Sequence, residues 1–110
     1  MKEHFEGLKE VELLEGVRAR FFPGEKMMFS FIKLEPGVLL PRHRHPHEQM
    51  GYVLEGSFLL RTGGKEWELE KDDMYFVRAG EDHEALAGDA GALVLDVFTP
   101  PREEYLEMTR

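Results

Sequence analysis

Residues that favour turns recur at short intervals along the whole chain. They are Pro23-Gly24, Pro36-Gly37, Glu55-Gly56, Gly63-Gly64, Lys71-Asp72-Asp73, Ala79-Gly80 and the segment from Gly88 to Gly91. Glycine reaches backbone conformations closed to other residues and proline fixes its own, so each group favours a turn. The segments between the groups are too short for ordinary helices. This spacing restricts the chain to a fold built from many short strands.

The segments between these turns have the composition of strands. They are rich in Val, Phe, Leu and Tyr, which favour a pleated surface. We predict strands at residues 17–22, 27–34, 52–54, 57–62, 65–70, 74–77, 83–87 and 92–98. Residues 2–16 are expected to form an arm or an edge strand. Short strands at this spacing are typical of an all-β antiparallel sandwich or barrel.

Two segments carry more specific patterns. In residues 65–70, Trp67 and Leu69 alternate with glutamates, which predicts an outer strand with one face in water and with Trp67 packed on a sheet. The tail differs from the rest of the chain, because Pro101 can open a short helical turn at the C-terminus.

Length and charge exclude several classes of protein. A chain of 110 residues, 42% of them hydrophobic, has enough apolar mass for one core, so residues 1–110 are expected to form a single domain. The 14 basic and 22 acidic residues give a net charge of -8, which argues against a nucleic-acid partner or an anionic membrane. No stretch has the apolar pattern of a signal peptide or a membrane span, so a cytoplasmic protein is expected.

Histidines are concentrated in one short run. His43, His45 and His47 lie within residues 41–49, and His83 follows later in the chain. Successive side chains of a strand alternate between its faces, so His43 and His45 can direct two imidazoles at one point, as a metal ion or an anion requires. The alternative is a polar loop. Because the chain has no cysteine, any metal must be held by nitrogen or oxygen.

An acidic residue interrupts the last apolar strand. Burying an unpaired carboxylate is costly, so Asp96 either forms an internal salt bridge, to Arg102 or Arg78, or faces a polar cavity where it can exchange protons. Asp96 and Phe98 share one face of the strand, and the prolines that follow allow Arg102 to return to the same place. The alternative for Phe98 is a core position, which is the usual role of an aromatic residue on a strand.

The spacing around the histidine pair forms an ordered motif. Gly37, His43, His45, Gln49 and Gly56 are separated by five, one, three and six residues. This pattern resembles the first motif of the cupin family, G-x5-H-x-H-x3/4-E-x6-G, with glutamine at the glutamate position. The resemblance implies a cupin jelly-roll, a β-barrel or sandwich of antiparallel strands.

A second cupin motif, G-x5-P-x-G-x2-H-x3-N, is matched more loosely. Gly80 and His83 agree with it in identity, whereas Arg78 and Ala87 stand at its proline and asparagine positions. Neither of these two positions is a metal-ligand position of the motif. His83 follows a glycine turn at the start of a predicted strand, where a sandwich can bring it beside the earlier histidine pair.

The cupin resemblance implies one divalent transition metal at the mouth of the barrel. The implied ligands are His43, His45, Gln49 and His83. His47 and Glu48 are alternatives to Gln49 as the fourth ligand. A nitrogen-rich site without thiolates suits Zn, Ni, Mn, Fe or Cu. A neutral glutamine leaves the full charge of the ion available to an anionic or enolate ligand.

The end of the last strand resembles a narrower group. The segment from Asp96 to Arg102, DVFTPPR, is similar to the ending of the pectin-degradation cupins, which convert 4,5-unsaturated uronates toward a linear keto form. The resemblance implies that Asp96, Phe98 and Arg102 are catalytic. Asp96 would be the general acid and base, while the metal and Arg102 would bind oxygens of the uronate. The implied partner is a small anionic substrate, a sugar acid.

Two other functions fit the same motifs. One is a non-catalytic cupin that binds a metal or a small ligand, and the other is a cupin dioxygenase that uses a redox metal in the same site. A poised acid at Asp96 favours the isomerase, because a binding module has no use for one. Small cupins commonly pair through edge strands, so the resemblance also implies a homodimer.

Overall fold

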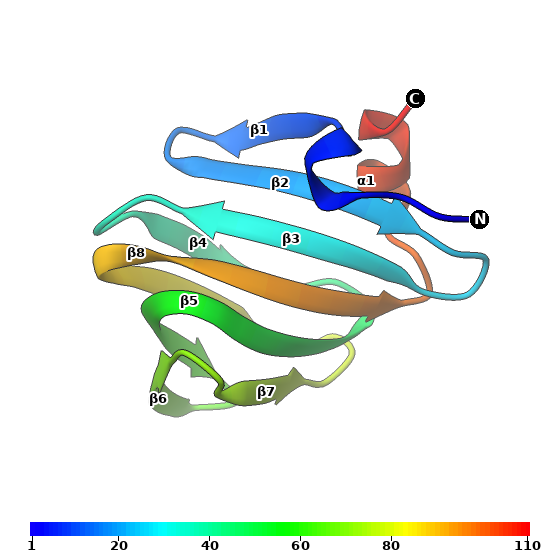
Figure 1. The fold of residues 1–110 in the computed structure, drawn as a ribbon. Coiled ribbons are helices and arrows are strands. Elements are labelled where there is room, and N and C mark those ends of the chain that lie inside the picture. The colour runs from blue at the N-terminus through cyan, green and yellow to red at the C-terminus, as the bar shows by residue number, and fades with distance from the viewer.

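The computed structural model describes residues 1–110 and consists mainly of strands (Figure 1). They are β1 (Glu10–Leu14), β2 (Val17–Pro23), β3 (Met28–Leu34), β4 (Leu39–His43), β5 (Glu48–Thr62), β6 (Lys65–Glu70), β7 (Met74–Val77) and β8 (His83–Thr99). A 3-10 helix, η1 (Phe5–Gly7), precedes them, and one α-helix, α1 (Glu103–Met108), follows. Neither helix has the length and apolar character needed to cross a membrane. The predicted all-β architecture with a short C-terminal helix is confirmed.

Two long strands join the layers of the fold. The strand order is β1-β2-β3-β8-β5-β6, with β4 paired to β8 and β7 paired to β5, and every pair is antiparallel. The C-terminal half of β8 pairs with β3 and the first half of β5, whereas its N-terminal half pairs with β4 and the end of β5. β5 and β8 therefore pass from one layer of a sandwich into the other, as Figure 1 shows.

Glycines bend these long strands where the sequence predicted turns. The expected breaks at Glu55-Gly56 and at residues 88–91 do not occur, because β5 and β8 continue through both positions. Gly56 and Gly91 have φ angles of 74° and 73°, and a Cβ atom on Gly56 would lie 2.0 Å from the carbonyl oxygen of Gly91. The two glycines let the strands bend and cross closely, which local sequence alone does not distinguish from a turn.

The edge strands follow the prediction in part. β1 pairs only with β2, so the edge strand expected within residues 2–16 is confirmed at 10–14. At the opposite edge, β6 pairs only with β5 and buries Leu69, as predicted. Trp67 differs from the prediction, because its side chain is 44% exposed. It lies near the turn into β6, on an edge strand that has a neighbour on one side only.

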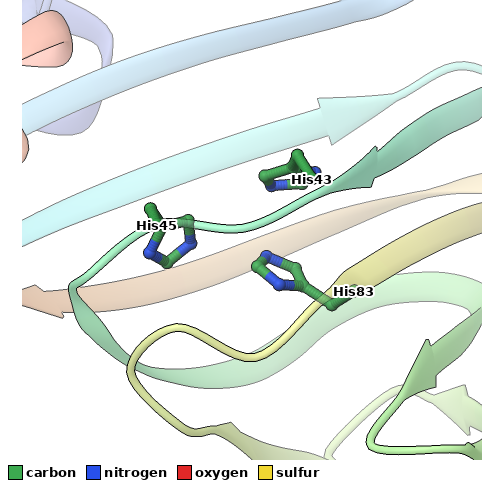
Figure 2. A group of neighbouring side chains, drawn as sticks. All are labelled: His43, His45 and His83. Atoms are coloured by element: carbon green, nitrogen blue, oxygen red, sulfur yellow. The ribbon is translucent and has the colours of Figure 1, made fainter.

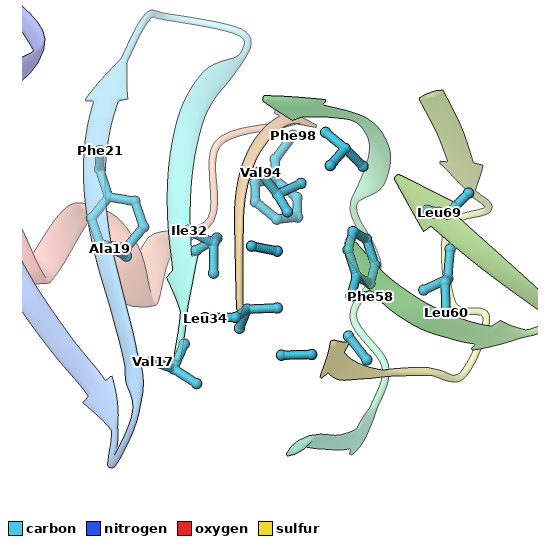
Figure 3. Close-up of a cluster of buried hydrophobic side chains, with 14 of the residues drawn as sticks. Val17, Ala19, Phe21, Ile32, Leu34, Phe58, Leu60, Leu69, Val94 and Phe98 are labelled. Atoms are coloured by element: carbon cyan, nitrogen blue, oxygen red, sulfur yellow. The ribbon is translucent and has the colours of Figure 1, made fainter. Parts of the chain in front are cut away.

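The hydrophobic core lies between the two layers (Figure 3). Alternate residues of β2 and β3 point inward, among them Val17, Phe21 and Ile32, and they meet Phe58 and Leu60 of β5. The inward positions of β8 continue this apolar series up to the polar side chains described next. The close packing of this core makes it a rigid support for the polar side chains that lie next to it.

Candidate functional site

Three histidines converge from different parts of the chain (Figure 2). His43 ends β4, His45 lies in the loop that follows, and His83 begins β8. One ring nitrogen from each can be chosen so that all three lie within 4.8 Å of one another. The antiparallel pairing of β4 with β8 places His43 opposite His83, so residues distant in sequence meet at the same point. The three histidine side chains therefore converge in the structure, as expected from the sequence.

Backbone carbonyls fix the orientation of two of the rings. His43 Nδ1 lies 2.8 Å from the carbonyl oxygen of Pro41, and His83 Nδ1 lies 3.0 Å from that of Glu81. A carbonyl oxygen only accepts, so Nδ1 is the protonated donor in each neutral ring. The lone pair then resides on Nε2, which is the arrangement that a metal-binding histidine needs. Burial lowers the pKa of His83, which favours the neutral ligand form.

The third histidine is linked to Gln49. His45 Nε2 lies 3.1 Å from Gln49 Oε1, and both side chains are buried. Burial lowers the pKa of His45 to about 4, and the positive charge of Arg102 acts in the same direction. Two ligand atoms at right angles, each about 2.1 Å from an ion, are about 3 Å apart. The separation of these two atoms therefore fits a shared metal ion.

The other candidates for a fourth ligand lie differently. Glu48 is exposed at the start of β5, where its side chain alternates with the buried Gln49. His47 is half-buried and is not among the three histidines whose ring nitrogens lie within 4.8 Å of one another. The donors around the cluster are thus three imidazole nitrogens and one amide oxygen. This set fits a divalent transition metal and selects no single element.

Asp96 is buried in β8 without an ion-pair partner. Its side chain is 6% exposed, and neither Arg102 nor Arg78 forms a salt bridge with it, so the internal ion pair considered from the sequence is absent. The hydroxyl of Tyr75 donates a hydrogen bond to its Oδ1 atom instead. Burial raises the pKa of Asp96 to about 6, although hydrogen bonds from Tyr75 and Gln49 act in the opposite direction. The carboxyl is therefore placed to exchange a proton near neutral pH.

Arg102 is held by aromatic rings. Its guanidinium carbon lies 4.1 Å from the ring centroid of Tyr105 and 5.1 Å from that of Phe98. Glu104 forms an ion pair with one terminal nitrogen, while the Nε atom is buried without a hydrogen-bond partner. The rings orient the cation and leave part of its donor set free for a ligand. The chain after β8 thus brings Arg102 back to Phe98, as predicted from the sequence.

These groups surround one small cavity of about 50 Å³. Its polar lining comprises His43, Gln49, His83, Asp96, Arg102, Tyr75 and Tyr105. Phe98 forms part of the wall and is also a member of the hydrophobic core, and its ring centroid lies 5.4 Å from that of His45. The two interpretations of Phe98 are therefore compatible. A wider groove of about 300 Å³ lies on the outer face near Arg18 and Lys33, away from the histidines.

Two tyrosines at this site were not predicted as functional. Tyr105 follows Arg102 by three residues at the start of a helix, a spacing that places two side chains on one face and so carried a usable signal. Tyr75 carried no such signal, because its contact with Asp96 depends on strand register. Burial raises the pKa of Tyr75 well above its ordinary value, so its hydroxyl stays protonated as a donor.

Comparisons with known proteins find a matching sequence family, related proteins and a similar solved structure. The sequence family described as "Cupin domain" matches residues 30–98. The pectin degradation protein KdgF of Dickeya dadantii is 27% identical over 97 residues, covering 86% of this chain and 88% of that protein. The oxalate-binding protein of Thermotoga maritima is 28% identical over 78 residues, covering 70% of this chain and 64% of that protein. The structure of KdgF from Halomonas sp. superimposes with a TM-score of 0.87 at 24% identity, covering 96% and 99% of the two chains.

Proposed function

Because the chain belongs to the cupin domain family, we propose that it is a metal-dependent enzyme that opens and isomerises an unsaturated uronate or a related sugar acid. One observation carries the proposal: the buried carboxyl of Asp96, which has no ion-pair partner, lines the same cavity as His43, His83 and Arg102. The similarity to the pectin degradation protein over most of both chains supports the choice of substrate class.

The metal would be held by His43, His45, His83 and Gln49. Such an ion supplies positive charge that polarises oxygens of the bound sugar acid. The carbonyl contacts at Nδ1 of His43 and His83 leave their Nε2 lone pairs directed away from the backbone, which supports their role as ligands. For the fourth position we propose Gln49, and we expect Gln49→Ala, but not Glu48→Ala, to lower metal content measured by elemental analysis.

Arg102 would bind the carboxylate of the substrate. A guanidinium offers paired donors that match a carboxylate, and the rings of Phe98 and Tyr105 hold this one in place before substrate arrives. The chain carries a net charge of -8, so a buried cation at the cavity is the local feature that favours an anion.

Asp96 would move the proton. As a base it takes the proton of the anomeric hydroxyl, the bond from that carbon to the ring oxygen breaks, and the ring opens to a carbonyl and an enolate. As an acid it then returns this proton to the carbon of the enolate, which gives the keto form. A carboxyl with a pKa of about 6 can serve in both directions near neutral pH.

The second candidate is a cupin that binds a small dicarboxylate or sugar acid without converting it. The similarity to the oxalate-binding protein favours this alternative. Both functions use the metal and Arg102, but binding alone requires no proton transfer from Asp96. A dioxygenase would use the same metal position and consume oxygen, so oxygen uptake with Fe or Mn loaded protein separates it from the other two.

The deciding experiment follows the ultraviolet absorbance of an unsaturated galacturonate. We expect the wild-type protein to remove this absorbance, and Asp96→Ala and His83→Ala to leave it unchanged. Glu68→Ala on the exposed edge strand β6 is the control and should retain full activity. A wild-type protein that binds the sugar acid without any loss of absorbance would support the binding function and exclude the isomerase.

For assembly we propose a homodimer formed by the outer face of the sheet. Phe29, Val97, Met50 and Phe76 are successive register partners across β3, β8, β5 and β7. Met50 and Phe76 are 57% and 46% exposed, and an apolar row of this extent favours a protein contact.

Charge supports a second copy as the occupant of this face. Lys33 and Glu55 flank Leu93 on the same face, two outward-facing rows from Val97, with the base on the β3 side and the acid on the β5 side. A two-fold axis parallel to β8 and lying between two stacked faces would bring Lys33 of one copy opposite Glu55 of the other.

A further inference from the structure

Three residues lie on one line across three strands. Gly51 of β5 is the register partner of Tyr75 on β7 and, on its other side, of Asp96 on β8. The side chains of Tyr75 and Asp96 therefore approach each other over the backbone of the strand between them. Their contact is the hydrogen bond from the Tyr75 hydroxyl to Asp96 Oδ1.

Gly51 provides the space for this contact. A Cβ atom on Gly51 would lie 2.1 Å from Cζ of Tyr75 and 2.4 Å from its hydroxyl oxygen, distances that no side chain can occupy. Gly51 is not among the glycines with a positive φ, so its backbone conformation is open to any residue. The absence of a side chain serves the close approach of the tyrosine ring, which is a recognised reason for glycine inside a strand.

The ring of Tyr75 is fixed from a second direction. Its centroid lies 5.7 Å from that of Phe58 in an edge-to-face arrangement, within the hydrophobic core. The hydroxyl lies at the cavity, while the ring packs on rigid strands. A hydrogen bond from a fixed ring holds the carboxyl of Asp96 in one orientation at the cavity, as proton transfer to a bound substrate requires.

We propose that Tyr75 is a positioning residue for proton transfer by Asp96, and that Gly51 is the strand position that admits it. This inference rests on the proposed isomerase function. Tyr75 acts through the carboxyl, so its loss slows the chemical step while the metal and Arg102 continue to bind substrate. A tyrosine that only satisfied a buried carboxylate would affect folding stability and leave kcat unchanged.

The test compares kcat and KM for unsaturated galacturonate in Tyr75→Phe and in a matched variant, Tyr52→Phe. Tyr52 donates a hydrogen bond of 2.8 Å to the exposed Asp72, so the same substitution removes the same kind of contact outside the cavity. We expect Tyr75→Phe to lower kcat about tenfold, the effect of one hydrogen bond to a charged group, with KM and metal content close to wild type. Tyr52→Phe should match the wild type in both constants.

Gly51→Ala is a second, independent variant that keeps the phenol and displaces the ring. It should lower kcat with KM and metal content retained, and adding it to Tyr75→Ala should have no further effect on kcat. The inference is overturned if folded Tyr75→Phe or Gly51→Ala keeps wild-type kcat while the wild-type enzyme is active. A wild-type protein without activity on the uronate overturns the proposed function and this inference together.

Discussion

His43 and His83 face each other as register partners of β4 and β8, with ring centroids 4.2 Å apart. Each ring donates through Nδ1 to a backbone carbonyl two residues earlier in the chain. A hydrogen bond of the same kind thus orients each ring, and the pairing of β4 with β8 sets the distance between the two rings. The pair of His43 and His83 is therefore built into the sheet, whereas the loop after β4 supplies His45.

His83→Ala should therefore abolish tight metal binding. Loss of a contact that only orients a ligand costs about 10–100-fold in affinity, and loss of the ligand itself should cost more. Elemental analysis of protein purified without a histidine tag measures the metal per chain. His4→Ala is the control, because His4 is exposed and its ring accepts a hydrogen bond from the backbone of the N-terminal helix η1, outside the cavity. Wild-type metal content in His83→Ala would contradict the proposed site.

The four residues of the proposed metal site could be predicted from the sequence. The alternation of side chains along a strand suggested that His43 and His45 converge, and the spacing of the cupin motifs added Gln49 and His83. The convergence of the four residues needed only the expectation of an antiparallel sandwich.

The bent strands and the contact of Tyr75 with Asp96 were not accessible in the same way. Gly56 and Gly91 have the same local signal whether a strand ends or bends, and the choice depends on the close crossing of β5 with β8. Tyr75 reaches Asp96 across a third strand, so its role depends on the register of two pairings at once. Register of this kind is fixed by the whole sheet.

Arg102→Lys should raise KM for the sugar acid by about tenfold and change kcat less. Lysine keeps the charge but loses the planar paired donors and the stacking on Phe98 and Tyr105. Steady-state kinetics on unsaturated galacturonate give both constants. Arg78→Lys is the matched control, since Arg78 is exposed outside the cavity. Equal KM values for the two variants would show that Arg102 does not bind the substrate.

Met50→Lys should dissociate the proposed homodimer. A charge at the centre of the apolar row on the outer face has to be desolvated in the dimer, which is costly without a partner. Light scattering coupled to size-exclusion chromatography measures the mass in solution. Leu39→Lys is the control, because Leu39 is also exposed, at 45%, but lies on β4 in the other layer. A wild-type monomer, or a Met50→Lys dimer, would rule out this face as the interface.

Asp96 makes the metal-free protein less stable as the pH rises. The folded protein holds this proton up to a pH of about 6, because burial raises the pKa of Asp96, whereas an aspartate in the unfolded chain has an ordinary pKa of 3.8. Between these two values the folded state binds more protons than the unfolded state, so the free energy of unfolding falls with rising pH. Above pH 6 the free energy of unfolding is lower by the full cost of ionising the buried carboxyl. For this difference between the folded and unfolded pKa values, the cost is up to about 3 kcal/mol.

Asp96→Asn removes this penalty and keeps an oxygen that accepts the hydrogen bond from Tyr75. In protein freed of metal by a chelator, the variant should unfold at a higher temperature than the wild type at pH 7.5. The difference should shrink toward pH 4, where the wild-type carboxyl is also neutral in the folded state. Acid destabilisation from His45, whose pKa burial lowers to about 4, is common to both proteins and cancels in the comparison. Equal melting temperatures at pH 7.5, measured by calorimetry, would mean that Asp96 is ionised in the folded protein at no cost, and the carboxyl would then not be poised for proton transfer.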